Sequence, residues 1–286
     1  MTIAAVMPLL QRAQMLHQQG RTGEAWITIA PLRQAIDGHG QALRLYALIA
    51  AAVGRTDEAV AAMQRILVLE REPPEMLGAL ADLLGNAGRH REALAFWDRL
   101  VTVRPDLADA HLNRAITASN AGNHALAVEA ADAGLKRFPG HARLLAAKAM
   151  ALKNAGRIEE SLACFDKAVA AEPGRALTRH NQAVALRAAR RFDEACSAYA
   201  EAARLGMDGA QFHANWAAAA LEAGDVPRAV DLYERALKDD PQHDETLQAL
   251  TRIHIEYRTG EDPFGHFANL AGLKPEDPNV WIRWAN

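Results

Sequence analysis

Small apolar residues recur along the chain in fixed phase with a glycine, at a period of 34 residues. An alanine stands seven places before each glycine, and an alanine or serine stands five places after it. The pattern predicts repeated units of a helix of about 13 residues, a break at glycine and a second helix of similar length. The glycine positions are Gly20, Gly54, Gly88, Gly122, Gly156 and Gly224, with Arg190 at the one vacancy.

Larger apolar residues and prolines follow the same period. Four places after the second small residue stand Ile29, Met63, Trp97, Phe165, Tyr199 and Tyr233, with Ala131 as the exception. Pro105, Pro139, Pro173 and Pro241 are expected to end the second helices, because proline cannot continue the hydrogen-bonded ladder. For the same reason Pro31 should kink the second helix of the first unit.

This pattern of small residue, glycine, small residue, aromatic and proline resembles the tetratricopeptide repeat. The resemblance covers essentially the whole chain and implies an all-α, right-handed superhelical solenoid whose concave groove is lined by the first helix of each unit. One domain, 1–286, is expected. Its complete repeats span 6–39, 40–73, 74–107, 108–141, 142–175, 176–209 and 210–243, followed by a degenerate eighth at 244–277 and a partial ninth at 278–286.

Composition and charge exclude several classes of protein. The 286 residues carry a formal net charge of −3, which gives no positive field for nucleic acid. No stretch approaches the ~20 apolar residues that span a bilayer, so no membrane partner is expected. Two cysteines suggest a reducing, cytoplasmic location. Cys164 and Cys196 are expected to be buried, unreactive thiols.

The sequence contains no motif typical of a catalytic, metal-binding or cofactor-binding site. The sequence has no HExxH or CxxC spacing and no glycine-rich phosphate loop, so we expect no catalytic site, metal or cofactor.

Asparagines mark the expected groove. Asn113, Asn181 and Asn215 occupy the sixth place of their units, which by family resemblance faces the groove. They resemble a partial asparagine ladder of O-linked N-acetylglucosamine transferase repeats, where a side-chain amide can pair with any peptide backbone. The alternative is that asparagine tolerates a solvated helix face. For the second row, Asn86, Asn120 and Asn154, we expect helix C-terminal capping.

Charge gives the expected groove a preference. The first helices of the fifth and sixth units, 142–155 and 176–189, contain no acidic residue, whereas that of the third holds Glu75 and Asp82 without a base. A wall of one sign concentrates field on a ligand, so acidic segments are favoured; a basic solvated face is the alternative. The basic residues are Arg143, Lys148, Lys153, Arg179 and Arg187, with His180 beside Asn181. Lys148 and Arg179 are less secure, since their places can turn into the hairpin. The residue pattern of the chaperone-binding carboxylate clamp is not present.

The sequence therefore predicts a non-enzymatic interaction module that binds an extended, acidic peptide in its groove. Two alternatives stay open. The unfinished ninth unit suggests a fragment, a substrate-recruiting region of a larger bacterial enzyme of glycosyltransferase, sulfotransferase or oxygenase type. Alternatively, Trp281 and Trp284 at the C-terminal end support self-association. In the eighth unit, Asp262 is expected to cap a short helix with Pro263 in its first turn.

Overall fold

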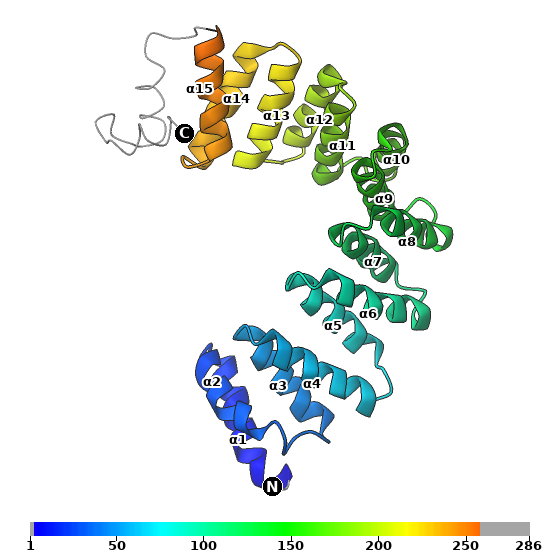
Figure 1. Ribbon diagram of the computed structural model, residues 1–286, viewed down its shortest axis with the longest axis vertical. Helices are drawn as coiled ribbons and strands as arrows, with labels where there is room; N and C mark the ends of the chain where they lie inside the picture. Colours follow the sequence, from blue (N-terminus) through cyan, green and yellow to red (C-terminus); the bar gives the residue numbers. More distant parts are fainter. Residues whose placement is uncertain (1–2, 258–286) are drawn as a thin grey trace, which may run out of the picture. The chain divides into compact units, whose positions relative to one another are not determined.

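The computed structural model describes residues 3–257, and in this part of the chain it contains fifteen α-helices, one short 3-10 helix and no strand (Figure 1). The helices alternate, and we call the first of each hairpin an A helix and the second a B helix. The A helices are α1 (Ile3–Gln18), α3 (Gly40–Ala52), α5 (Pro74–Asn86), α7 (Ala108–Asn120), α9 (Ala142–Asn154), α11 (Ala176–Ala188), α13 (Ala210–Glu222) and α15 (Asp244–Tyr257). The B helices are α2 (Thr22–Ile29), α4 (Thr56–Leu69), α6 (His90–Val103), α8 (His124–Arg137), α10 (Ile158–Ala171), α12 (Phe192–Arg204) and α14 (Val226–Asp239). The predicted all-α helical repeat is confirmed.

The chain forms two compact units, residues 1–139 and 140–286. In the N-terminal unit α1 packs on α2, α3 on α4, α5 on α6 and α7 on α8; in the C-terminal unit α9 packs on α10, α11 on α12 and α13 on α14. Within each unit the B helix of one hairpin also packs on the A helix of the next. None of the helices among residues 3–257 is both long and apolar enough to cross a membrane.

The helix breaks adopt the left-handed backbone that the glycines predict. The six periodic glycines have φ between 75° and 86°. After Gly156, the N–H of Arg157 donates to the carbonyl of Leu152 at 2.9 Å, which closes the helix end. Arg190 adopts φ 60°, and the N–H of Arg191 donates to Leu186 at the same 2.9 Å. The break is therefore kept where glycine is missing.

The prolines end helices as expected. Helices α6, α8, α10 and α14 each stop two residues before their proline. At Pro31 the effect is stronger than the predicted kink: α2 ends at Ile29 and continues only as a 3-10 helix over Ala30–Leu32.

Two of the three asparagines at the helix ends, Asn86 and Asn120, do not cap their helices. Asn86 and Asn120 are the last residues of α5 and α7, yet both side chains are exposed and make no hydrogen bond with the described residues. The backbone N–H groups of the following turn satisfy the carbonyls instead. The capping role predicted for these two residues is wrong.

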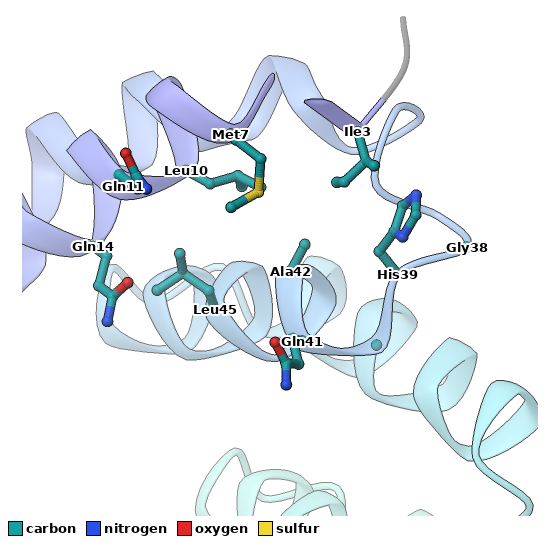
Figure 2. Close-up of a pocket in the computed structure, with 11 residues that line it drawn as sticks. Ile3, Met7, Leu10, Gln11, Gln14, Gly38, His39, Gln41, Ala42 and Leu45 are labelled. Atoms are coloured by element: carbon teal, nitrogen blue, oxygen red, sulfur yellow. The ribbon is translucent and has the colours of Figure 1, made fainter. Parts of the chain in front are cut away.

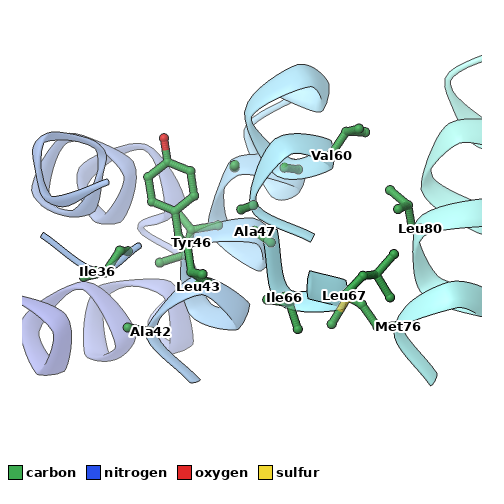
Figure 3. Close-up of a cluster of buried hydrophobic side chains, with 14 of the residues drawn as sticks. Ile36, Ala42, Leu43, Tyr46, Ala47, Val60, Ile66, Leu67, Met76 and Leu80 are labelled. Atoms are coloured by element: carbon green, nitrogen blue, oxygen red, sulfur yellow. The ribbon is translucent and has the colours of Figure 1, made fainter. Parts of the chain in front are cut away.

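The repeated small residues form the hairpin contacts. All fourteen are buried, none more than 4% exposed. Ser161, the one serine among them, donates its hydroxyl to the carbonyl of Ala149 at 2.7 Å across the hairpin, so the two small places face each other. Larger side chains pack between hairpins: Figure 3 shows Leu67 of α4 beside Met76 and Leu80 of α5.

The cysteines differ. Burial raises the pKa of the Cys196 thiol, as expected of an unreactive cysteine. Cys164 is only half-buried, so the prediction of a buried thiol is wrong there. The predictions for Asp262, Pro263, Trp281 and Trp284 concern residues outside the described part of the chain.

Candidate functional site

An exposed strip runs along α11 in the C-terminal unit. Leu177, His180, Asn181, Val184 and Arg187 recur at helical spacing and are half-buried or exposed. The opposite side of the helix is buried against neighbouring helices. Asn181 and Arg187 therefore lie on a surface that solvent can reach.

Helices α9 and α13 carry matching strips. Because α11 packs directly on both helices, the three strips adjoin. We call this surface the A-face of the C-terminal unit. It comprises Arg143, Ala147, Met150 and Lys153 from α9, the five residues named on α11, and Gln211, Asn215, Ala218 and Glu222 from α13.

An ion pair links two of these strips. Arg187 Nε lies 2.6 Å from Glu222 Oε2, and Nη2 lies 3.0 Å from Oε1. The hydrogen bonds to Glu222 raise the pKa of Arg187 above its usual value. One of the predicted groove cations is thus paired with a carboxylate from the next hairpin.

The other predicted cations separate into two groups. Arg143 is exposed and Lys153 half-buried on the A-face, and Lys153 has no partner among the described residues. Arg179 instead lies 3.3 Å from Gln182 Oε1 and lines a small hollow with residues of α12. Arg179 therefore lies on the side of α11 that faces its own hairpin partner α12, which is the orientation that the sequence left open for it.

The three asparagines lie in two units. Asn181 and Asn215 are half-buried on the A-face, at the same place of successive repeats. Asn181 makes no hydrogen bond with the described residues, and Asn215 Oδ1 lies 3.4 Å from Gln211 Nε2, a long contact. Asn113 is half-buried on α7 of the N-terminal unit. Ligand contact by these amides stays a prediction.

His180 of the A-face is half-buried and packs against a cluster of rings. Its ring centroid lies 5.7 Å from that of Tyr199 and 5.8 Å from that of Phe212, and burial lowers its pKa. This burial favours the uncharged imidazole over the charged one. Tyr199 also stacks on Trp216 at 6.5 Å. The Tyr199 hydroxyl and Trp216 Nε1 are buried without a hydrogen-bond partner among the described residues.

The N-terminal unit contains a pocket of about 590 Å³ between α1 and α3, which the sequence analysis missed (Figure 2). Met7, Leu10 and Leu45 form apolar walls, and Gln14 and Gln41 add side-chain amides. No aspartate, glutamate, lysine or arginine lines it, and His39 is its one histidine. Such a pocket fits an apolar side chain whose backbone meets the amides. The 34-residue phase places Met7 and Gln41 at the same place of two successive A helices, but it does not show the space between those helices.

One group of residues in the described part of the chain has the geometry to hold a metal ion. Asp208, His213 and Asp239 each offer a ligand atom, and these atoms lie within 4.8 Å of one another.

Comparisons with known proteins agree with the fold. A family model described as tetratricopeptide repeat matches residues 79–142, and one described as Psidin, N-terminal TPR repeats region, matches residues 115–227. No curated protein matches the chain.

Solved structures share the architecture at low sequence identity. A tetratricopeptide repeat protein from Parabacteroides merdae is 16% identical, with TM-score 0.64 over 86% of this chain and 97% of that chain. The C-terminal part of a TPR repeat-containing protein from Cytophaga hutchinsonii is 14% identical, with TM-score 0.59 over 84% and 99%. YrrB, a TPR protein with an unusual peptide-binding site, is 18% identical, with TM-score 0.50 over 67% and 98%. Together with the 34-residue helical hairpins, these matches show that the chain has the fold of tetratricopeptide-repeat proteins.

Proposed function

We propose that the protein is an interaction module that binds an extended peptide segment of a partner protein on the A-face of the C-terminal unit. The main support comes from Asn181 and Asn215, two half-buried residues at the same place on adjoining helices. Most of the hydrogen-bonding capacity of their side-chain amides is unused. An amide both donates and accepts, so it suits a peptide backbone of any sequence. The relative YrrB, by its description, has a peptide-binding site.

We propose further that the segment is acidic. Arg143, Lys153 and Arg187 on the A-face outnumber its single acid, Glu222. Each exposed charge contact contributes only roughly 0.2–1 kcal/mol, so selectivity requires several acting together. Attraction of this kind weakens as salt screens it.

The test is binding of a labelled acidic peptide and a charge-reversed peptide, measured by fluorescence anisotropy at low and high salt. The Asn181→Ala/Asn215→Ala double variant should lose affinity about tenfold for both peptides, since two backbone hydrogen bonds are removed. Lys153→Glu should weaken binding of the acidic peptide only. The matched control is Lys167→Glu, on the exposed side of the B helix α10. Salt-independent binding would refute the acidic preference, and full affinity in the double variant would refute the site.

Two alternatives remain predictions: a substrate-recruiting region of a larger enzyme, and a scaffold that self-associates through Trp281 and Trp284. Both depend on residues beyond the described part, so the A-face supports neither. The cytoplasmic location likewise remains a prediction.

A further inference from the structure

We propose that Asp208, His213 and Asp239 form a binding site for a divalent transition-metal ion, with Zn²⁺ the best match. The site is independent of the peptide-binding proposal. It combines three separate segments: the connection between α12 and α13, the first turn of α13 and the last turn of α14.

The three residues lie close enough together to share one small ion after side-chain movement. His213 Nδ1 lies 3.0 Å from Asp239 Oδ2, and His213 Nε2 lies 3.4 Å from Asp208 Oδ1. Ligand atoms in a tetrahedral zinc site, with bonds of about 2.0–2.2 Å, stand roughly 3.3–3.5 Å apart. The two carboxylates face different nitrogens of the ring, so a metal held on one nitrogen requires the carboxylate beside the other nitrogen to rotate toward it. The ligand atoms of the three residues lie within 4.8 Å of one another, which keeps that movement short. The ion takes the place of a proton on that nitrogen, so binding releases a proton where the nitrogen carried one.

Two of the ligands are already held in position. The His213 side chain is only 12% exposed, and its ring lies 5.5 Å from that of Phe212. Asp208 Oδ1 accepts a hydrogen bond from the N–H of Gly209 at 2.9 Å. Partners that orient a ligand reduce the cost of ordering it when the metal binds.

The local field also favours a cation. Asp239 is the last residue of α14 and Asp240 follows it. The C-terminus of a helix carries partial negative charge. The two carboxylates at this end are therefore repelled by the helix terminus and by each other. A divalent cation would relieve this repulsion, and His213 supplies the only nitrogen ligand of the group.

The donor set selects the metal. Imidazole nitrogen and carboxylate oxygen are both ligands that zinc accepts, whereas calcium takes six or more oxygens and magnesium keeps a nearly all-oxygen shell. Three protein ligands leave a fourth position for water or for a side chain of a bound partner. The spacing along the sequence, five residues and then twenty-six, matches no short motif, so the motif search could not find the site.

The test uses the intact chain freed of metal by chelation. Zn²⁺ binding is measured by calorimetry, and Co²⁺ binding by visible absorption, which reports tetrahedral nitrogen–oxygen coordination. We expect one equivalent to bind the wild type and raise its Tm. His213→Gln should abolish this binding, and Asp239→Asn should lower the Zn²⁺ affinity at least tenfold.

His39→Gln is the matched control, because it removes an exposed histidine in the N-terminal unit and should leave binding unchanged. Asp208→Asn, a nearly isosteric change, serves as a second weakened variant, and circular dichroism checks that each variant is folded. One-equivalent binding that persists in His213→Gln, or a wild type that binds no tighter than this variant, would overturn the proposal.

Discussion

Arg187 on α11 and Glu222 on α13 form a two-point ion pair, with distances of 2.6 Å and 3.0 Å, on the surface proposed to bind acidic peptide. Both side chains are more than a third exposed, so the pair is open to solvent. The Glu222 carboxylate occupies the guanidinium edge that a carboxylate of a ligand would use. A bound acidic segment must therefore displace Glu222 or share Arg187 with it.

Glu222→Gln should raise the affinity for an acidic peptide several-fold, because Arg187 is released and one repelling charge is removed. The measurement is anisotropy binding of the same peptide to both proteins. Glu201→Gln is the control, since Glu201 forms an equivalent two-point pair with Arg204 on the B helix α12. Equal affinities for wild type and Glu222→Gln would show that Arg187 does not contact the ligand.

Arg190→Gly should stabilise the protein by up to about 1 kcal/mol. Arg190 adopts φ 60°, a conformation in which a side chain is strained and glycine is not. Part of the gain is offset because glycine has more freedom in the unfolded chain. Chemical denaturation measures the change, and the reverse substitution Gly156→Arg should destabilise. A destabilised Arg190→Gly would mean that the arginine contacts outweigh the strain.

Tyr199→Phe should leave stability unchanged or raise it by about 1 kcal/mol at neutral pH, because the hydroxyl is buried without a partner. Burial raises the pKa of Tyr199 to about 12, above the usual 10. A raised folded-state pKa means that this residue's contribution is intact below about pH 10 and is lost as pH rises toward 12.

Urea unfolding at pH 8 and at steps from pH 10 to pH 12 separates the two effects. The wild type should lose more stability over the alkaline range than Tyr199→Phe does. A marked loss of stability in Tyr199→Phe at pH 8 would instead show that the hydroxyl is hydrogen-bonded in solution.

Thiol labelling should distinguish the two cysteines. Cys196 is buried and its pKa is raised, so little reactive thiolate forms, whereas Cys164 is half-buried. Iodoacetamide at pH 8 followed by peptide mass spectrometry should modify Cys164 first. Equal rates under native conditions, with unfolded protein as the reference, would contradict the burial of Cys196.

The 34-residue period predicted the fold because the same residue types occupy the same places in each unit. Glycine set the helix breaks, alanine the hairpin contacts and Pro31 the early end of α2. The surface was harder to predict, because it depends on pairs from different repeats. The acid that pairs with Arg187 comes from the next hairpin, 35 residues away, so counting charges helix by helix missed it.

The same limit explains the other differences. The pocket between α1 and α3 and the group around His213 exist only where separate helices meet. His180 was expected to contribute to the binding groove, but neighbouring rings from α12 and α13 partly bury it. The periodicity of the sequence predicts on which side of its helix a residue lies. Which residues of neighbouring helices face it depends on how the helices pack.

The α7–α8 hairpin differs from the others at its centre. The buried cluster around Ala115, Ala130 and Ala131 contains no side chain larger than alanine, whereas the corresponding place of the next hairpins holds Phe165 and Tyr199. Leu112 is also buried in α7, but with alanine at this place less apolar area leaves water than in α5 and α6. The amides of α7 and α8 should therefore exchange with deuterium faster than those of α5 and α6. Local unfolding would then begin at α7 and α8 while the aliphatic core of the preceding hairpins stays intact.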